Sequence, residues 1–286
     1  MYYICTMKKV FHYPDIQQIN VLDERFYTEK DTGVFYPSST EVLNVYPKGI
    51  GFTNWLKENG KDSDKIKEFY GNRGSNVHNA VDRINAGVRV NWLNPFTNEY
   101  DYTVDEWKMI SHYFDFYTRF NPELLTVINH EGEEQKASEL RLLSHTHKLG
   151  GTLDMGLMLN GRRGVVDVKT TGDVYSTHEL QVASYAMMWN DTYPDQPIDF
   201  TGILWLNAKT RTEGKKGAIQ GAGWQLVTYD RHYTKAFKLF EACRLIWDEE
   251  NPNPKPKNLI YPDSFCIEDI EKETALRNAL NIQENE

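Results

Sequence analysis

The chain has 286 residues, of which 40% are hydrophobic and 26% charged, a composition that is ordinary for globular proteins of one or two domains. Its formal net charge of −9 argues at first sight against a polyanionic partner. No run approaches the roughly 18 apolar residues of a membrane span and the N-terminus lacks the apolar segment of a signal peptide, so we expect an intracellular protein without a membrane partner.

Helices are predicted for most of the N-terminal part of the chain. Residues 1–35 show no clear pattern, and three short helices are expected after them, at 38–43, 52–56 and 65–70. A longer helix begins after Ser75 and can end at Gly87, because apolar residues repeat between them at helical spacing: Val77, Ala80, Val81 and Ile84. His78 and Asp82 lie on a neighbouring face of this helix.

Another helix and two strands are predicted next. Thr103 and Glu106 form a capping-box pattern ahead of four large residues at helical spacing. We assign these four residues to the core rather than to a base-stacking platform: Trp107, Ile110, Phe114 and Tyr117. After this helix the pattern changes to strands over 124–129 and 137–145.

A β-hairpin is predicted around Asn160-Gly161, which separates two apolar runs. If the turn contains only these two residues, Asp154 lies directly opposite Asp167, and both project from the same face as Lys169. The other face of the hairpin is then apolar, with Leu153, Met155, Leu157, Leu159, Val166 and Val168.

Two carboxylates that face each other on paired strands repel. With Cβ atoms roughly 5 Å apart and an effective dielectric constant of about 20, the repulsion is on the order of 3 kcal/mol. A divalent cation reverses its sign, and carboxylate oxygens suit Mg²⁺ or Mn²⁺. Two alternatives stay open: a solvated strand face with an ordinary Asp/Lys salt bridge, or a longer turn over 160–163 that shifts the register.

The C-terminal half is predicted to continue as helix, strand, strand and helix. Ser176 and Glu179 form a capping-box pattern for the first of these helices, on which Gln181 and Tyr185 lie one turn apart. The remaining elements are expected as strands at 200–208 and 223–229 and a helix at 232–249.

Charge is distributed unevenly along the chain. Between residues 202 and 240 seven basic residues stand against two acidic ones, a net of +5, and the loop 209–221 contains several of them. This stretch is compatible with nucleic acid, although a solvated loop has the same composition. The octet NPNPKPKN at 251–258 is typical of a stiff spacer, and an acidic tail follows it.

The order of elements predicts a mixed α/β fold, with a central mixed sheet flanked by helices. We expect three regions. A mainly helical N-terminal region over 1–121 carries His78 and packs on or arches over the core. The core spans 122–250, and the proline-rich spacer and acidic tail occupy 251–286.

Seven residues of these elements lie in short motifs. Along the chain they are His78 in GSNVH, Glu139 in SEL, Asp154 in GGTLD, Asp167 and Lys169 in DVKTT, and Gln181 with Tyr185 in QVASY. In this combination and order the motifs resemble the PD-(D/E)xK nucleases, and among them the RecB-like exonucleases. The resemblance covers about residues 37–205 and is greatest to stand-alone mitochondrial and phage members, because the chain carries no helicase.

The chain departs from the family pattern in two places. Leu153 precedes Asp154 where the family's name has proline, a position that RecB-like members commonly lack. Three cysteines, Cys5, Cys243 and Cys266, are too few for the four thiolates of an iron-sulfur cluster, so we expect no such cluster. A phosphate-cradling GxxxxGK[ST] loop is also absent from the sequence, and no nucleotide cofactor is expected.

The resemblance implies a restriction-endonuclease-like core and a site for one or two Mg²⁺ or Mn²⁺ ions. Asp154, Asp167 and the backbone carbonyl of Val168 would bind the metal, and His78 would add a nitrogen ligand that favours Mn²⁺. Lys169 would orient or help to deprotonate the attacking water and would neutralise phosphate charge. The sequence leaves the protonation state of Lys169 open.

Several further candidate residues have alternative roles. Glu139 is either a ligand through water or only a charge at a strand edge. Gln181 and Tyr185 would reach phosphate oxygens and steady Lys169, or they only pack their helix on the sheet. Apart from the resemblance, the charge of the loop 209–216 favours phosphate contacts by Lys209 and Arg211. His145 and His147 form an HxH pair on one predicted strand face, a candidate metal pair elsewhere without a third ligand in view.

The activity implied is hydrolysis of DNA phosphodiester bonds from a single strand or a free end, in replication, recombination or repair. Such a site does not read bases. Replication or recombination proteins are candidate partners, and phage or bacterial cytoplasm is the expected setting. Two alternatives stay open: a structure-specific endonuclease with the same site, and a non-catalytic DNA-binding accessory protein. Cleavage polarity and strand preference do not follow from these residues.

Overall fold

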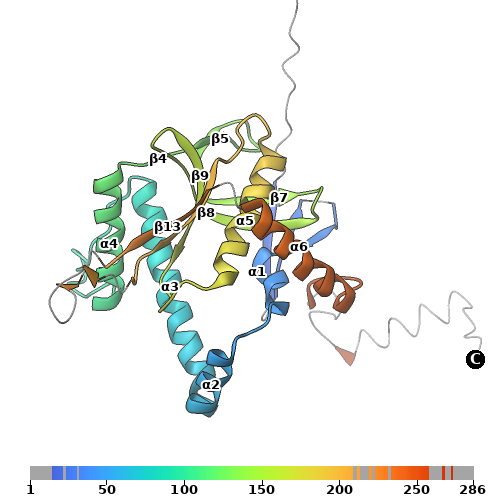
Figure 1. The fold of residues 1–286 in the computed structure, drawn as a ribbon, viewed down its shortest axis with the longest axis horizontal. Coiled ribbons are helices and arrows are strands. Elements are labelled where there is room, and N and C mark those ends of the chain that lie inside the picture. The colour runs from blue at the N-terminus through green and yellow to red at the C-terminus, as the bar shows by residue number, and fades with distance from the viewer. Residues whose placement is uncertain are drawn as a thin grey trace, which may run out of the picture.

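The computed structural model describes residues 15–21, 24–30, 32–208, 211–212, 219–220, 223–230, 233–257, 266–267 and 272 (Figure 1). Its centre is a six-stranded sheet, formed by β4 (Glu123–Leu124), β7 (Ser138–Ser144), β8 (Leu149–Leu159), β9 (Arg162–Lys169), β10 (Phe200–Trp205) and β13 (Gln225–Asp230). The strand order is β13-β10-β9-β8-β4, and β7 also pairs with β8. Since β9 and β10 are parallel and the other pairs antiparallel, the sheet is mixed.

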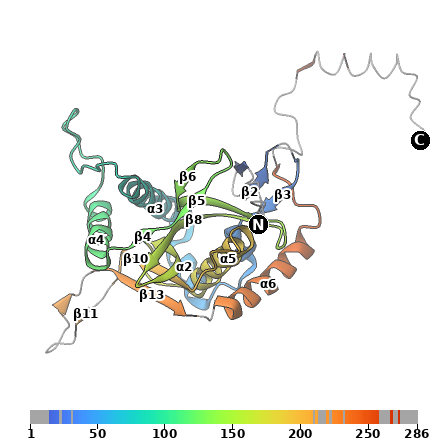
Figure 2. The ribbon, with the colours of Figure 1, turned by 90° about the horizontal axis from the view of Figure 1, so that it is seen from above.

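Helices cover both faces of this sheet (Figure 2). On one face lie α3 (Ser63–Asn85) and α4 (Val104–Phe120), whose apolar side chains pack against those of β8, β9 and β10. On the other face lie α5 (Ser176–Thr192) and α6 (Tyr233–Glu250). The predicted α/β class, with a central mixed sheet between helices, is confirmed.

The N-terminal region contains a sheet that the sequence did not predict. Its strands are β1 (Ile16–Val21), β2 (Glu24–Glu29) and β3 (Phe35–Pro37), all antiparallel. The side chain of Tyr27 in β2 fills the space beside Gly150, where a Cβ would lie 2.4 Å from the Tyr27 Cβ and 2.5 Å from its ring. The expectation of a mainly helical region over 1–121 is therefore correct only after this sheet, from α1 (Ser39–Val42) and η1 (Leu43–Val45) onward.

Helix α3 is longer than predicted. It runs without a break through the predicted gap between 70 and 75, although Gly71 and Gly74 lower its intrinsic helix propensity. Gly74 crosses the end of β9, and a Cβ there would lie 3.3 Å from Thr170 Oγ1, so close packing favours glycine at this point. The helix ends as predicted, with Gly87 at a φ of +74°.

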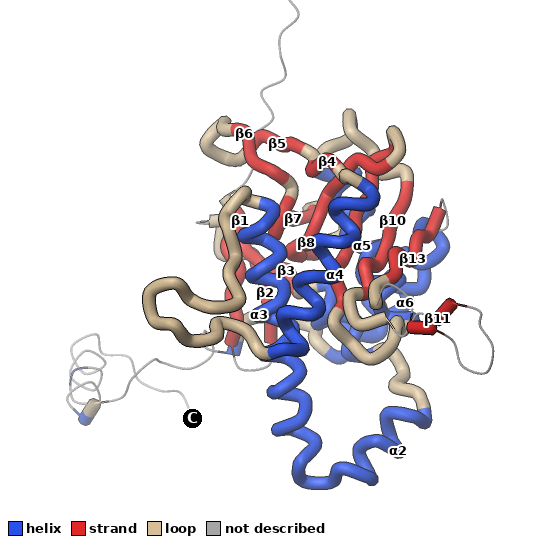
Figure 3. Tube along the Cα trace, turned by 90° about the vertical axis from the view of Figure 1, so that its left-hand side faces the viewer, coloured by secondary structure: helices blue, strands red, loops and turns tan. Residues whose placement is uncertain are grey.

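The first turns of α3, together with α2 (Ile50–Asn59) and η2 (Gly60–Asp62), project from the body of the protein (Figure 3). No side chain of α2 is buried.

Helix α4 has the predicted capping box and, except at Phe114, the predicted contacts with the core. Thr103 accepts from the backbone of Glu106, and the Glu106 side chain accepts from the backbone of Thr103. Phe114, assigned to the core from sequence, is 64% exposed. Ile110 is buried as predicted, and Trp107 and Tyr117 are partly buried and pack against the core. The fully buried positions also include Met109, Tyr113 and Phe116, which the sequence did not assign.

The remaining elements follow the predictions with small shifts. The strand expected over 124–129 is split between β4 and β5 (Thr126–Ile128), which pairs with β6 (Glu134–Lys136). Helix α5 starts one residue earlier than predicted: Tyr175 is its N-cap and His178 Nδ1 accepts from the Tyr175 N–H, so the Ser176/Glu179 capping box is wrong. Two short strands, β11 (Arg211–Thr212) and β12 (Ile219–Gln220), pair in the basic loop.

The C-terminal segment is described in part. Residues 251–257 contain no α-helix or strand, in agreement with the predicted spacer, and Lys257 Nζ lies 3.1 Å from Glu24 Oε1. The predicted acidic tail lies almost entirely outside the described residues. Among the helices that the structure describes, none combines the length and apolar character required to cross a bilayer.

Candidate metal centre

The hairpin of β8 and β9 has the predicted register. Asn160 and Gly161 both have positive φ, +50° and +75°, as a two-residue turn requires. Leu159 pairs with Arg162, and the ladder continues to Met155 and Val166. The alternative of a longer turn is therefore wrong, and Asp154 and Asp167 occupy the next position outward.

The two strands separate immediately beyond Met155 and Val166. At this fork the carboxylate of Asp154 takes the place of a backbone acceptor, since its Oδ2 accepts from the Val168 N–H at 2.6 Å. Because the N–H and C=O of a strand residue lie on the same edge, the Val168 carbonyl also faces the fork. Leu153, predicted on the face of Met155, packs instead with the residues under α5, which is a correction of the predicted alternation.

Three side chains from three elements converge on this fork. His78 Nδ1 of α3 lies 3.3 Å from Asp154 Oδ1 and 3.8 Å from Glu139 Oε1 of β7. The potential ligand atoms of these three residues all lie within 4.8 Å of one another. The sequence left Glu139 as either a ligand through water or a charge at a strand edge. In the structure its carboxylate lies near enough to His78 and Asp154 for the three residues to bind one ion together.

A backbone distortion and a group of hydrogen bonds position Glu139. Its φ is +46°, unusual for a residue inside a strand, and costs on the order of 1 kcal/mol or more. The preceding Ser138 is held to α3, because its Oγ donates to Asp82 Oδ1 at 2.7 Å and accepts from Asn85 Nδ2 at 3.0 Å. Tyr113 of α4 donates in turn to Asn85. Apart from Asp82, none of these supporting residues had a signal in the sequence.

A second group of side chains extends from the fork toward α5. Lys169 Nζ lies 2.7 Å from Asp167 Oδ2 and donates to Gln181 Oε1 at 3.1 Å. Gln181 Nε2 donates to the Tyr185 hydroxyl at 2.8 Å. Gln181 and Tyr185 are only 8% and 5% exposed, and they form a hydrogen-bonded chain that ends at Lys169. Asp167 belongs to this group and lies outside the cluster of His78, Glu139 and Asp154.

The acidic groups of the centre differ in pKa. Burial, together with the charge of Asp154, raises the pKa of Asp167 to about 6, although the charge of Lys169 opposes the shift. Burial also raises the pKa of Glu139 above its ordinary value, although His78 opposes this. For Asp154 burial acts in the same direction, but the charge and hydrogen bonding of His78, together with the charge of Lys169 and the Val168 N–H, outweigh it and lower the pKa. Asp154 is therefore the most strongly ionised acid of the three.

The basic groups of the centre are held protonated. Burial alone would lower the pKa of His78, but Asp154 and then Glu139 raise it to about 10. The pKa of Lys169 is likewise raised, because Asp167 and Asp154 outweigh burial. The imidazolium of His78 thus carries a positive charge that attracts the carboxylates of Asp154 and Glu139.

The donor set fits a divalent cation. Two carboxylate oxygens and one imidazole nitrogen suit Mn²⁺, and the carboxylates alone suit Mg²⁺. Asp167 Oδ2 is buried and, among the described residues, forms no hydrogen bond, since its contact with Lys169 has the length but not the angles of one. Asp167 Oδ2 can therefore still accept a hydrogen bond or bind a cation. The residues that could hold a metal are His78, Glu139 and Asp154, with Asp167 and the Val168 carbonyl beside them.

The buried imidazole of His178, near Lys169, makes the stability of the protein depend on pH. It is 8% exposed, and burial together with the charge of Lys169 lowers its pKa to about 3. An unfolded histidine has a pKa of about 6.5. The stabilising contribution is therefore fully present above this value and is lost as the pH falls towards 3. We expect the free energy of unfolding to fall by about 2 kcal/mol from this group between pH 7 and pH 5.

Urea unfolding of the wild type and of His178→Gln at the two pH values checks this expectation. The glutamine can accept from the Tyr175 N–H but does not titrate. The wild type should lose about 2 kcal/mol more than the variant on acidification, and equal losses in the two proteins would contradict the assignment.

Other predicted site residues lie apart from the centre. His145 and His147 lie in the turn after β7, not on a strand face: His145 contacts Tyr36 and Glu29, whereas the ring of His147 packs on Phe237. The predicted HxH metal pair is wrong. Lys209 lies outside the described residues, and Arg211 is described only by its backbone in β11.

Comparisons with known proteins add little to this geometry. No family model matches the chain, and no curated protein matches it significantly. Among solved structures, one described as "Crystal structure of SSO0001" is 12% identical in sequence, with a TM-score of 0.24. The match covers 52% of this chain and 59% of that chain. A likeness of this size supports no conclusion about fold or activity, so the function rests on the centre itself.

Proposed function

We propose that the protein is a Mg²⁺- or Mn²⁺-dependent DNA nuclease that acts as an exonuclease on single-stranded or frayed ends, in replication, recombination or repair. The observation that carries the proposal is the convergence of His78, Glu139 and Asp154 within 4.8 Å, beside the buried Asp167–Lys169 pair. The motifs that resemble RecB-like exonucleases supply the residues of this centre, in the same order along the chain.

The side chains around the centre have distinct tasks in this proposal. When bound, a divalent cation would polarise a phosphate oxygen and lower the pKa of an attacking water. Lys169 remains protonated, donates one N–H to Gln181 and forms an ion pair with Asp167, so it retains an N–H group that could donate to a phosphate oxygen. Tyr185 accepts from Gln181 and keeps its proton, since burial raises its pKa well above the ordinary value. It is a positioning residue for Lys169.

A time course with end-labelled linear DNA and circular single-stranded DNA tests the proposal. Linear DNA should be shortened from its ends in Mg²⁺ or Mn²⁺ and remain intact with chelator, whereas circular DNA should persist. Cleavage of the circle would favour the endonuclease alternative. Binding without any metal-dependent cleavage would favour the non-catalytic accessory protein, and no effect on either DNA would reject the proposal.

Addition of Mn²⁺ is expected to stabilise the protein, because a bound cation relieves the repulsion among the carboxylates. At a hundred times the Kd the gain is about 2.7 kcal/mol, which raises the unfolding midpoint by roughly 5 °C. Calorimetric or fluorescence melting measures this shift. Glu139→Gln should weaken Mn²⁺ binding about tenfold if Glu139 is a ligand.

Glu131→Gln, on an exposed carboxylate of the β5–β6 turn, is the matched control for this measurement. If Mn²⁺ raises the unfolding midpoint equally in Glu139→Gln and in the control, Glu139 is not a ligand but only a charge at the strand edge.

A further inference from the structure

The N-terminal sheet lies on the α3 face of the central sheet, opposite α5 and α6 (Figure 2). Leu140 of β7 and Leu153 of β8 pair with each other and pack with the residues under α5. Because side chains alternate along a strand, Arg141 and Thr152, which also pair, project from the α3 face. Leu143, two residues after Arg141, packs against the N-terminal sheet. Arg141 and Thr152 therefore lie beside this sheet.

The same two residues adjoin the metal centre. Thr152 precedes Asp154 by two residues on β8, and Arg141 follows Glu139 by two residues on β7, roughly 7 Å along each strand. Asp154 contacts His78 of α3, so it projects from the same face as Thr152. Arg141 and Thr152 thus lie between the N-terminal sheet and the candidate ligands, close enough for one DNA strand to contact both.

Three polar side chains form a hydrogen-bonded cluster at this place. The Tyr27 hydroxyl of β2 lies 2.9 Å from Thr152 Oγ1, and each of these oxygens lies 3.1 Å from Gln18 Oε1 of β1. Burial raises the pKa of Tyr27, whereas its bond with Thr152 and the charges of Arg25 and Arg141 oppose the shift. The phenol therefore keeps its proton, and both guanidinium groups lie near enough to act on it.

The two arginines are held in place but are not neutralised. Arg25 Nε donates to Asn20 Oδ1 at 3.1 Å, and the same oxygen accepts from Gln18 Nε2. Arg141 Nη1 donates to the Ile16 carbonyl at 3.2 Å. Both arginines are exposed. In the part of the chain that the structure describes, neither forms an ion pair with a carboxylate, and their remaining N–H groups form no hydrogen bond.

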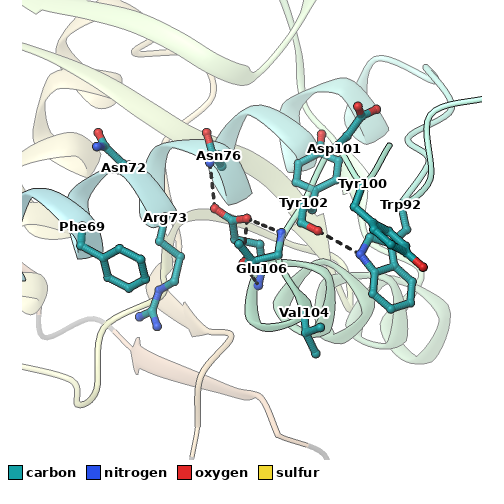
Figure 4. A pocket seen from close by; sticks show the side chains of 11 residues that line it. Phe69, Asn72, Arg73, Asn76, Trp92, Tyr100, Asp101, Tyr102, Val104 and Glu106 are labelled. Carbon is teal, nitrogen blue, oxygen red and sulfur yellow. Dashed lines mark hydrogen bonds between the residues drawn. The ribbon is translucent and has the colours of Figure 1, made fainter. Parts of the chain in front are cut away.

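Arg73 of α3 is in a different situation. It lines a pocket of about 700 Å³ between α3 and the first turn of α4, together with the acids Asp101 and Glu106 (Figure 4). Its Nη2 donates to the Thr170 carbonyl at 2.9 Å, and its guanidinium lies 4.7 Å from the ring centroid of Tyr70. This pocket has no excess of positive charge, so it does not suit a polyanion.

We propose that the surface beside the N-terminal sheet binds a backbone phosphate of DNA next to the phosphodiester at the metal centre, an inference that rests on the proposed nuclease function. The residues of this phosphate surface are Gln18, Arg25, Tyr27, Arg141 and Thr152. Guanidinium groups suit a phosphate because their N–H groups form charge-assisted hydrogen bonds in a planar fork. None of these contacts requires a base, so the phosphate surface positions the strand without selecting a sequence.

The order of the strands gives this surface a distinct place along the DNA. Arg141 of β7 and Lys169 of β9 lie on opposite sides of β8, which carries Asp154. A strand that crosses β8 at the metal centre can therefore contact a cation on each side of the candidate ligands. Lys169 would contact the phosphate at the centre, and the phosphate surface the neighbouring one.

Neutral phosphate analogues test the proposal. A labelled oligothymidylate receives one methylphosphonate, which removes a single negative charge, at each position in turn, and its binding to the full-length protein is measured by fluorescence anisotropy in Ca²⁺. At one position the analogue should weaken wild-type binding about tenfold, but not the binding of Arg25→Gln or Arg141→Gln. Each variant should also reduce the slope of log affinity against log salt by about 0.7.

Lys238→Gln is the matched control, because Lys238 is exposed on α6 on the opposite face of the sheet. It removes the same charge and should retain the wild-type salt slope and position dependence. Wild-type behaviour of Arg25→Gln and Arg141→Gln, or the absence of DNA binding by the wild type, overturns the proposal. Cleavage of DNA does not rescue it. Conversely, a sensitive position that both variants abolish, in a protein that never cleaves DNA, keeps the phosphate surface and rejects the nuclease.

Discussion

Asp154→Asn is expected to reduce DNA cleavage by about a thousandfold or more. Asparagine keeps an oxygen that can accept from the Val168 N–H, so the fork between β8 and β9 should persist. It removes the negative charge that faces His78 and hence one of the three converging ligands. The measurement is the initial rate on end-labelled single-stranded DNA in Mn²⁺, together with the Mn²⁺-dependent rise in melting temperature, which should also disappear.

The matched control for this variant is Asp105→Asn, on the exposed first turn of α4. It removes the same charge from the protein and should retain full cleavage. If Asp154→Asn cleaves within about tenfold of the wild type, the centre at the fork does not carry the activity.

Lys169→Met is expected to abolish cleavage and also to destabilise the protein, by about 3 kcal/mol at neutral pH. The substitution leaves the carboxylate of Asp167, only 3% exposed in its side chain, without its cation. Because the pKa of Asp167 already lies at about 6, protonation limits the cost, and the loss of stability should be smaller at pH 5 than at pH 7. Urea unfolding at the two pH values measures this.

The double variant Lys169→Met/Asp167→Asn separates the two effects. With both charges removed, most of the lost stability should return, since an uncompensated buried charge is no longer present. Cleavage should remain absent, because the phosphate has lost its cation and the centre one acid. A double variant as unstable as Lys169→Met, or one that cleaves, would contradict the assigned pairing.

The hairpin could be predicted from sequence because its determinants are local. Asn160-Gly161 specifies a turn in which both residues have positive φ, and the period of two then determines which residues face each other. Asp154, Asp167 and Lys169 could therefore be placed near one another without any knowledge of the rest of the chain. The error at Leu153 arises where the two strands separate and the alternation is no longer imposed by pairing.

The features that could not be predicted from sequence depend on contacts between distant segments. Glu139 becomes a potential direct ligand only because its backbone adopts a φ of +46° and because α3 holds Ser138. The continuity of α3 through Gly74 depends on its crossing with the end of β9, which outweighs helix propensity. The N-terminal sheet depends on the fit of Tyr27 beside Gly150. None of these pairings leaves a periodic pattern in the sequence.

The aromatic residues of α4 show the same limit. Helical spacing correctly indicated a buried stripe that includes Ile110, but the stripe is centred closer to Tyr113 and Phe116, so that Phe114 is exposed.

The two-residue turn at the tip of the hairpin has a genetic consequence. Asp154 lies six residues from it, roughly 20 Å along the strand. An extra residue that enters the β9 arm at this tip would leave every potential ligand in the sequence and every helix in place, yet would turn Asp167 and Lys169 to the opposite face of the hairpin. Alleles that abolish the proposed activity are thus expected at a solvent-exposed loop far from the candidate metal centre.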